Sequence, residues 1–358
     1  MMDYTNKPIL LKSDNFTPLV RTPWAGSEIG KLYKKDYEGK AIGESWEFSC
    51  DPAFPSGLQG GGTLQEFVEA YPEKSLSKPL MERLKYPTCE ILIKLLNAAS
   101  PLSLQVHPDD DDQGLGPDEC GKPESWLVLH AEKDAGIYLG FSRVITVSEL
   151  ERKLTSGDNI EELLQFVPVK AGDYFDIAPG VPHAIGPGVV LLEPQRIRYG
   201  NSGKTYRLWD WGRKYNDRGE IDLENGRSRD LHLSAGLKLL DLETQVGPGF
   251  VDSTRRSPVT KNLGSCQWLA FPANSYYQVH LLDGVRERIS FDYKKGYLAL
   301  VVLGGEVRLE YEGGVTILSL GSSAFLPAAL SKLEMSSVTG AKLTLVHPAG
   351  TNLKVVMS

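Results

Sequence analysis

The stretch GDYFDIAPGVPH, Gly172 to His183, indicates how this chain folds. A short apolar run lies between a glycine and a Pro-Gly turn, and a histidine begins the next run. A second copy of the pattern, GSSAFLPAALS from Gly321 to Ser331, has a serine where the first copy has its histidine. Short apolar strands separated by glycine and proline turns are typical of β-sandwiches and barrels. We therefore predict two small β-barrels, of which only the first is equipped for chemistry.

The composition narrows the class of protein. The 358 residues are 41% hydrophobic and 24% charged, as in soluble globular proteins. The net charge of −7 argues against a general nucleic-acid binder, which needs basic surface to neutralise phosphates. No apolar stretch approaches the roughly 20 residues of a membrane span, and the first apolar run, Ile9 to Leu11, is too short for a signal peptide. We expect neither nucleic-acid nor membrane partners.

The cysteines limit the kind of metal site. The chain has 4 cysteines, widely scattered and without a Cys-x-x-Cys pair. This pattern fits neither a disulfide framework nor a thiolate zinc site, and it predicts a reducing, cytoplasmic location. Any metal must therefore use histidine and carboxylate ligands. The chain has 6 histidines to choose from: His107, His130, His183, His232, His280 and His347.

Helical signals are few. GGTLQEFVEAYPEK has Thr63 as an N-cap, followed by apolar residues at helical spacing. TVSELERKLTSGDNIEELLQFV predicts two short helices over about residues 146–166, and a further turn is expected from Met81 to Leu84. Residues 247–262, GPGFVDSTRRSPVTKN, are polar and lack periodicity, so we expect a linker there.

Candidate ligands begin with the strand PLSLQVHPDD, Pro101 to Asp110. Because side chains alternate along a strand, Ser103, Gln105 and His107 share one face, opposite Leu, Leu and Val. An amphipathic edge strand would explain this pattern when it is taken alone. Other polar residues at the same place would instead indicate a site.

Two further residues are candidates for the same site. Glu124 begins the apolar strand in GKPESWLVLHAEKDAGIYLGF, where a carboxylate would be costly to bury without a partner. It is either a solvated glutamate at the start of a strand or a metal ligand. His183 follows the Pro-Gly turn in VKAGDYFDIAPGVPHAIGPGVVLLEPQ, and it is either a structural histidine or another ligand.

Several motifs resemble a known family. Gly-x6-Pro-x-Gly-x2-His is similar to the second motif of the cupin superfamily, a metal-binding jelly-roll β-barrel. LSLQVHPDD, GKPESW, GVPHAIGPG and TYRLWDWGR together resemble type I mannose-6-phosphate isomerase (phosphomannose isomerase), as do the earlier TPWAG and IGESWEFS. The resemblance covers roughly residues 20–215 in order and continues more weakly through the tail. It implies a mainly β protein, with a cupin-type catalytic barrel and a degenerate cupin-like barrel after it.

The resemblance implies one zinc ion per chain. Glutamine and histidine two residues apart on a strand point the same way, so both reach one ion. Imidazole nitrogen and carboxylate oxygen are ordinary zinc ligands. His130 lies about 20 Å further along its strand than Glu124, so we discount it, as we do the three later histidines. The ligands carried over from the family are Gln105, His107, Glu124 and His183.

The implied reaction interconverts mannose 6-phosphate and fructose 6-phosphate through a cis-enediol. It needs a group that moves a proton and a group that stabilises the developing oxyanion. The resemblance assigns Lys122 to proton transfer or oxyanion stabilisation and Glu193 to acid or base. Arg207, a permanently charged fork, suits either the enediolate or the phosphate. Lys94 and Ser103 are the positions associated with the phosphate.

The chain departs from the family at two positions. Gly121 and Gly203 stand where many relatives have a histidine and an acidic residue that have been linked to ring opening or proton transfer. This leaves the proton-transfer base and the ring-opening group open. Two other readings are a non-haem iron oxygenase, since two histidines and a carboxylate also form that site, and a non-catalytic sugar-binding cupin. A fourth ligand at Gln105 disfavours the oxygenase.

The domain organisation follows from these assignments. We expect a catalytic cupin domain over residues 1–240, with the helical segment at 146–166, and a C-terminal cupin-like β domain without metal ligands over 241–358. The expected partner is a small sugar phosphate. The sequence leaves open the oligomeric state, a catabolic or biosynthetic role, and the tolerance of other sugar phosphates.

Overall fold

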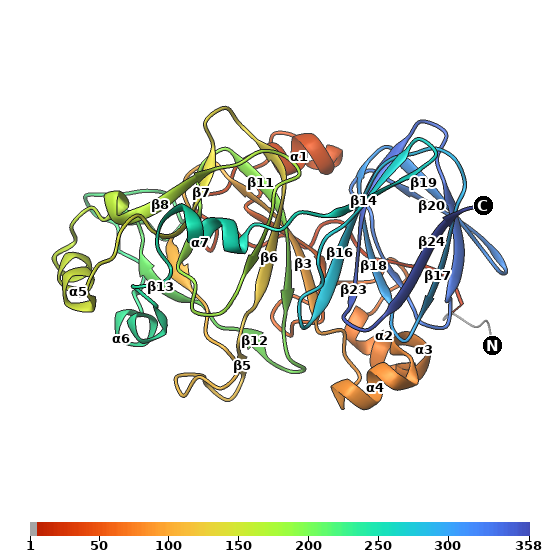
Figure 1. The fold of residues 1–358 in the computed structure, drawn as a ribbon, viewed down its shortest axis with the longest axis horizontal. Helices are drawn as coiled ribbons and strands as arrows, with labels where there is room; N and C mark the ends of the chain where they lie inside the picture. The colour runs from red at the N-terminus through yellow and green to blue at the C-terminus, as the bar shows by residue number, and fades with distance from the viewer. Residues whose placement is uncertain (1–5) are drawn as a thin grey trace.

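The computed structural model describes residues 6–358 and shows two β-barrels side by side (Figure 1). The first barrel has two five-stranded sheets, ordered β13-β4-β10-β7-β8 and β2-β3-β11-β6-β9. The bounds of its strands are β2 Glu44–Phe48, β3 Ile91–Ala98, β4 Leu104–Val106, β6 Glu124–Ala131, β7 Gly136–Phe141, β8 Leu164–Pro168, β9 Tyr174–Ile177, β10 His183–Ile185, β11 Val189–Arg196 and β13 Tyr206–Trp209.

The second barrel pairs a seven-stranded sheet, β1-β21-β18-β23-β16-β15-β14, with a five-stranded sheet, β20-β19-β22-β17-β24. Its first strand comes from the N-terminal end of the chain, where β1 pairs with β21. The bounds are β1 Ile9–Leu10, β14 Val259–Leu263, β15 Cys266–Ala270, β16 Tyr277–Val285, β17 Ile289–Lys294, β18 Leu298–Gly304, β19 Glu306–Tyr311, β20 Gly314–Ser319, β21 Ser323–Leu326, β22 Lys332–Ser336, β23 Ala341–Pro348 and β24 Asn352–Met357.

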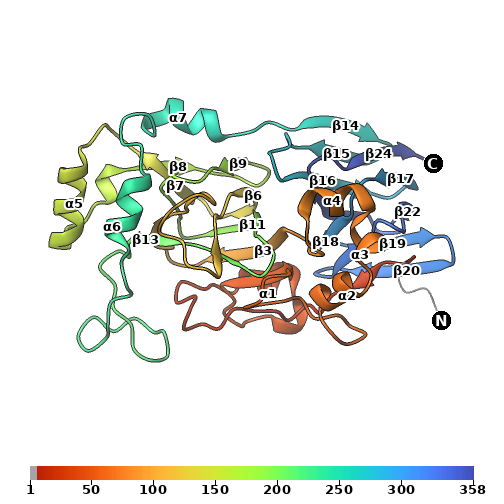
Figure 2. The same ribbon diagram turned by 90° about the horizontal axis from the view of Figure 1, so that it is seen from below.

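The helices are short and lie outside the barrels (Figure 2). Helix α2 begins with the predicted cap, because the Thr63 hydroxyl accepts from the Glu66 amide and Glu66 returns a bond to the Thr63 amide. The remaining elements are α1 Glu28–Tyr33, η1 Lys35–Tyr37, α2 Leu64–Ala70, α3 Pro72–Leu76, α4 Lys78–Leu84, α5 Val147–Ser156, η2 Glu161–Leu163, α6 Leu233–Gly236, η3 Leu237–Leu239, α7 Gly247–Thr254, and a two-strand parallel ladder of β5 Glu119–Cys120 and β12 Ser202–Gly203.

Strand β3 explains how the two barrels share a core. Its sequence ILIKLLNA is buried at every position, because both of its faces are covered. Ile93 and Leu95 pack with Tyr277 and Val279 of the second barrel. Lys94, on the other face, points into the first barrel. One face of β3 therefore lines the polar interior of the first barrel, and its other face packs against the second barrel.

The mainly β prediction is confirmed, but two local expectations are wrong. The second helix expected before residue 166 is a single 3-10 turn followed by β8, because Val167 is buried and pairs with Ile137. Residues 247–262 are not an unstructured linker: they form α7 and most of β14. Buried Val251 anchors α7, and β14 pairs with β15. In both places tertiary packing overrode the local signal.

Candidate metal centre and active-site cavity

The register of three strands brings candidate residues into one row. His183 on β10 is the direct partner of Gln105 on β4, and Gln105 is in turn the partner of Arg207 on β13. Directly opposed residues in a sheet project from the same face. His183, Gln105 and Arg207 therefore lie side by side on one face of the barrel wall.

The opposite wall brings Glu124 to this row. Its Oε2 atom lies 3.3 Å from His107 Nε2, and its Oε1 atom lies 3.4 Å from His183 Nε2. All three residues are at most 2% exposed, and one ligand atom from each lies within 4.8 Å of the others. Two ligands of a tetrahedral zinc ion, each 2.0–2.1 Å from the metal, lie about 3.3 Å apart. The donor set and its spacing therefore fit a zinc-sized cation.

Backbone carbonyls orient both imidazoles for this role. His107 Nδ1 lies 3.1 Å from the Lys204 carbonyl, and His183 Nδ1 lies 2.8 Å from the Val181 carbonyl. A carbonyl only accepts, so each Nδ1 carries the proton, and each Nε2 has a lone pair on the side of the ring that faces Glu124. The buried His183 Nε2 has no hydrogen-bond partner. Burial lowers the pKa of His183 and, together with Lys122, lowers the pKa of His107 to about 3. Both rings are therefore neutral at pH 7.

Glu124 is held as a carboxylate by its neighbours. The Lys122 ammonium lies 3.1 Å from Glu124 Oε2 and 3.2 Å from His107 Nε2. A positive charge therefore already contacts two of the candidate ligand atoms. Gln195 Nε2 donates to Glu124 Oε2 at 2.8 Å, and Trp126 Nε1 donates to Oε1 at 3.1 Å. Burial alone would raise the pKa of Glu124, but the charge of Lys122 and the contact with His107 hold it well below its usual range.

A second carboxylate lies beside the first in the same polar interior. Glu193 accepts from Gln195 Nε2 at 2.5 Å and from Trp126 Nε1 at 3.2 Å, and its Oε2 atom lies 3.5 Å from Lys94 Nζ. Burial and the negative charge of Glu124 raise the pKa of Glu193 to about 7, against the charge of Lys94. Two neighbouring carboxylates with pKa values pushed apart are typical of acid–base sites.

A cavity of about 400 Å³ adjoins the cluster. The sequence prediction named six of the residues that line it: Lys94, Ser103, Gln105, Lys122, Glu193 and Arg207. Other lining residues had no predicted role, among them Glu44, Trp46, Gln195 and Arg229. Glu44 and Trp46 lie within the quoted motif IGESWEFS, which was the available signal. The Lys94 ammonium lies 4.5 Å from the centre of the Trp46 ring.

Both Gly121 and Gly203 lie close to neighbouring atoms. A Cβ atom at Gly121 would lie 2.7 Å from the backbone of Asp109 and Asp110. A Cβ atom at Gly203 would lie 2.9 Å from Lys122 Cγ. A side chain at Gly121 would require the backbone of Asp109 and Asp110 to shift, and one at Gly203 would require the Lys122 side chain to move.

The side chains of Arg196 and Lys204 and of two later histidines lie outside the cavity. Arg196 pairs with Asp110 at 2.6 Å and Lys204 with Glu119 at 2.6 Å, and neither lines the cavity. His280 and His347 are buried in the second barrel, where their Nε2 atoms lie 2.9 Å apart. Within residues 6–358, His107, Glu124 and His183 form the one cluster of three or more histidine, cysteine or carboxylate groups with metal-ligand spacing.

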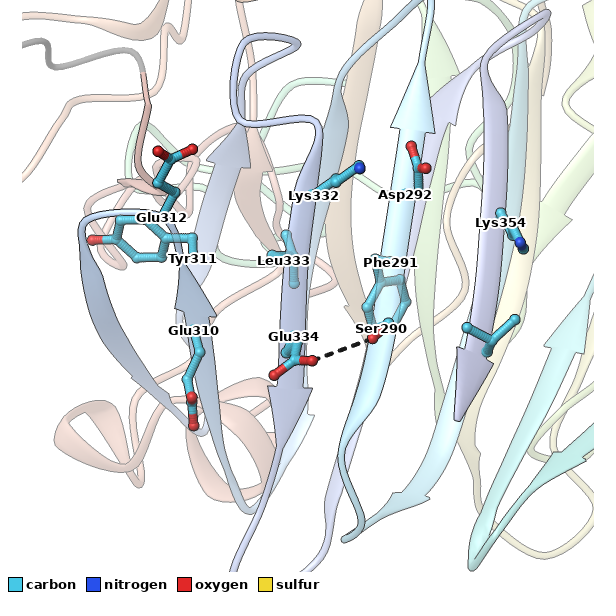
Figure 3. A pocket seen from close by; sticks show the side chains of 11 residues that line it. Ser290, Phe291, Asp292, Glu310, Tyr311, Glu312, Lys332, Leu333, Glu334 and Lys354 are labelled. Atoms are coloured by element: carbon cyan, nitrogen blue, oxygen red, sulfur yellow. Dashed lines mark hydrogen bonds between the residues drawn. The ribbon is translucent and has the colours of Figure 1, made fainter. Parts of the chain in front are cut away.

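A second hollow, of about 550 Å³, lies on the outer face of the second barrel (Figure 3). Ser290, Phe291 and Asp292 line it; the two polar residues are half-buried, whereas the Phe291 side chain belongs to the apolar core. Lys332 and Glu334 show the same alternation around Leu333. The charged residues here follow the outward face of ordinary amphipathic strands. This hollow therefore lacks the buried, convergent polar groups of the first barrel.

Comparison with known proteins agrees with the geometry of the cluster and cavity. No family model matches the chain. The chain is 33% identical over 318 residues to the mannose-6-phosphate isomerase ManA of Bacillus subtilis, covering 87% of this chain and 91% of the relative. The chain belongs to the mannose-6-phosphate isomerase family. It is an isomerase, as that family membership implies.

Solved structures of this family share the fold. A mannose 6-phosphate isomerase from Bacillus subtilis matches with a TM-score of 0.78 at 24% identity, over 95% of this chain and 99% of that chain. A mannose 6-phosphate isomerase bound with zinc and yttrium matches with a TM-score of 0.68 at 17% identity, over 95% of this chain and 98% of that chain. None of the helices in the part of the chain that the structure describes is long and apolar enough to cross a membrane.

Proposed function

We propose that this isomerase is zinc-dependent and interconverts mannose 6-phosphate and fructose 6-phosphate through a cis-enediol. The observation that carries the proposal is the buried His107–Glu124–His183 cluster beside a cavity lined by both acidic and basic groups. The family relationship supports a sugar phosphate as the substrate. The sugar's C1 and C2 would lie at the cluster, and its phosphate would lie toward a basic part of the cavity.

One zinc ion per chain would be held by His107, Glu124 and His183, with Gln105 as a fourth ligand. Register places Gln105 directly opposite His183, and Gln105 lines the cavity. The neutral imidazoles, the unpartnered His183 Nε2 and the zinc bound by a structural relative support this assignment. A bound zinc ion supplies Lewis-acid polarisation of the carbonyl and hydroxyl oxygens.

Proton transfer falls to residues of the cavity wall. A general base works best when its pKa lies near the working pH, and the raised pKa of Glu193 meets this condition. We assign Glu193 to moving the proton between C1 and C2. The Lys122 ammonium, held beside Glu124, would donate to the oxyanion that develops at C1 or C2.

The remaining predicted residues would contact the substrate. Arg207 presents a permanently charged fork to the cavity, suited to an anionic part of the sugar phosphate. Lys94 and Ser103 line the same cavity, and we keep them as polar substrate contacts. The Lys94 ammonium is already near Glu44 and Glu193, whose charges raise its pKa although burial opposes this.

We propose that residues 1–240 carry the catalytic function and that residues 241–358 form a cupin-like β domain without metal ligands. All the proposed ligands lie in the first of these parts. Residues 1–5 lie outside the described part of the chain. The four cysteines are buried free thiols, which supports a reducing, cytoplasmic location.

A coupled assay for conversion of mannose 6-phosphate to fructose 6-phosphate tests the function. We expect turnover in zinc-loaded protein, loss after treatment with a chelator, and recovery when zinc is returned. Absence of turnover in the zinc-loaded protein would contradict the proposal. Metal analysis separates the other readings, since an oxygenase would contain iron, and a binding protein would retain the sugar phosphate without converting it.

A further inference from the structure

Two guanidinium groups line the part of the active-site cavity that adjoins β13. Arg207 is on β13, and Arg229 follows 22 residues later in an irregular segment. This segment is docked on β13, because the Arg207 amide donates to His232 Nδ1 at 3.1 Å and Arg207 Nη1 donates to the Asp230 carbonyl at 2.9 Å. The fold therefore brings Arg229 beside Arg207, which the family resemblance assigns to the active site.

One carboxylate fixes the position of Arg229. Asp210 Oδ2 accepts from Arg229 Nε and Asp210 Oδ1 accepts from Arg229 Nη2, both at 2.7 Å. The same Oδ1 accepts from Arg213 Nη2 at 2.7 Å, and the Arg229 guanidinium lies 5.3 Å from the centre of the Tyr215 ring. Such a two-point bond leaves the guanidinium little freedom. Arg229 is therefore already oriented before any ligand binds.

The cluster carries more positive than negative charge. Arg207, Arg213 and Arg229 gather around the single carboxylate of Asp210, three positive groups against one negative group. Asp230 is exposed, so solvent screens its carboxylate. A phosphate monoester carries a charge of about −1.5 to −2 at pH 7. The excess of about two positive charges therefore matches one phosphate group.

Arg207 is incompletely paired in this arrangement. Its Nε atom is buried and has no hydrogen-bond partner. Burial lowers the pKa of Arg207, and the nearby charge of Arg229 lowers it further. Two like charges held together in a partly buried place cost free energy unless an anion joins them. The arrangement therefore favours a doubly charged anionic ligand.

We propose that Arg229, oriented by Asp210, binds the phosphate group of the substrate together with Arg207 and thereby determines specificity for a phosphorylated sugar. This inference rests on the proposed function. The spacing supports it: Arg207 lies two strands from His183, about 10 Å at the usual strand separation, which suits an extended six-carbon sugar phosphate. The metal would then take one end of the substrate and the guanidinium pair the other.

Lys94 is the competing candidate for the phosphate. Its ammonium lies 3.5 Å from Glu193 and 4.5 Å from the centre of the Trp46 ring, and the charge of Glu44 also acts on it. Most of its charge is therefore already balanced by carboxylates. The positive charge of Arg207 and Arg229 is only partly balanced by carboxylates. We therefore favour this pair over Lys94 as the phosphate site.

The test compares Arg229→Gln with Arg227→Gln. Arg227 is exposed, does not line the cavity, and bonds to Tyr215 through its backbone, so its variant removes the same charge from the same segment. Inorganic phosphate is the probe, and its effect on Tm is measured along with KM and kcat for mannose 6-phosphate. We expect Arg229→Gln to lose the phosphate-induced rise in Tm and to raise KM roughly 10- to 100-fold, with a smaller change in kcat. Arg227→Gln should behave like the wild type.

Arg229→Lys serves if the glutamine variant does not fold. It keeps the charge and loses the fork, so KM should lie between those of the wild type and Arg229→Gln. Wild-type KM and phosphate response in Arg229→Gln would overturn the inference. So would loss of the phosphate response in Lys94→Gln while Arg229→Gln keeps it. A zinc-loaded wild type without turnover but with an Arg229-dependent phosphate response would contradict the proposed function and leave the anion site in place.

Discussion

The side-chain amide of Gln195 donates to Glu124 Oε2 at 2.8 Å and thereby orients the carboxylate of the proposed metal site. A hydrophobic side chain of similar length at this position would remove one of the bonds that orient Glu124, beside those from Trp126 and Lys122. Groups that orient metal ligands typically contribute 10- to 100-fold to metal affinity. We therefore expect Gln195→Leu to weaken zinc binding by about that factor, measured by competition with a coloured chelator.

The matched control for Gln195→Leu is Gln278→Leu. Gln278 is a half-buried amide on β16 of the second barrel, where its Nε2 atom donates to the Phe271 carbonyl at 2.9 Å. This variant should lose a comparable amount of stability and keep its zinc affinity. Equal zinc affinity in both variants would show that the amide of Gln195 does not support the metal.

His183 and Arg207 share one face of the barrel wall, but their alanine variants should lose different properties. We expect His183→Ala to weaken zinc binding by more than about 100-fold, since it removes a ligand rather than a supporting group. Arg207→Ala should keep its zinc and lose kcat/KM by about 100-fold or more. Zinc content after dialysis and the coupled assay measure the two effects. Normal kinetics in Arg207→Ala would remove this residue from the mechanism.

Glu193 should impose an acidic limb on the pH profile. Its pKa is raised to about 7, so it is ionised above that pH and protonated below it. As a general base it must be ionised, and kcat/KM should fall about tenfold for each pH unit below its pKa. A cation bound at Glu124 cancels part of the charge that raises this pKa, so the limb should lie at or somewhat below pH 7. Glu193→Gln should be slow and lack this limb; an unchanged profile in the variant would reject Glu193 as the base.

The sequence predicted the fold class from local pattern, whereas the candidate metal cluster came from the family resemblance. Strand alternation put Gln105 and His107 on one face, and the quoted motifs linked them to Glu124 and His183. The structure places His107, Glu124 and His183 within reach of one another. A row of short strands separated by glycine turns indicated a β-sandwich or a β-barrel, and the family resemblance favoured the barrel.

The residues that the sequence missed depend on long-range pairing. Gln195 contacts Glu124 because β11 pairs with β6 in a register that sets these two residues opposite each other. Arg229 reaches the cavity because Asp210 binds it from β13's end. Helix α7 forms in a polar stretch because its Val251 side chain is buried against the rest of the protein. The local sequence around these residues does not predict their partners, because each contact depends on the tertiary structure.

The buried pair His280 and His347 should make the protein sensitive to acid. Trp268 Nε1 donates to His280 Nδ1 at 3.1 Å, so His280 carries its proton on Nε2. His347 Nδ1 lies 3.0 Å from the Pro348 carbonyl and must donate to it, which leaves His347 Nε2 to accept from His280 Nε2 at 2.9 Å. A further proton on either ring would break this series of hydrogen bonds. Burial accordingly lowers the pKa of His280 to about 3 and lowers that of His347.

The lowered pKa values of His280 and His347 make the folded protein less stable as the pH falls. The unfolded chain takes up protons on these histidines near pH 6.5, whereas the folded chain resists until about pH 3 at His280. Their contribution to stability is therefore complete above pH 6.5 and is lost as pH falls, by up to about 1.4 kcal/mol per pH unit for each ring. His347→Gln keeps a donor and an acceptor without a titrating ring, so the free energy of unfolding from urea titrations should fall less steeply with acid. Gln278→Leu, which removes no titrating group from the same barrel, is the control and should keep the wild-type slope. Identical slopes in all three proteins would show that the pair does not govern acid stability.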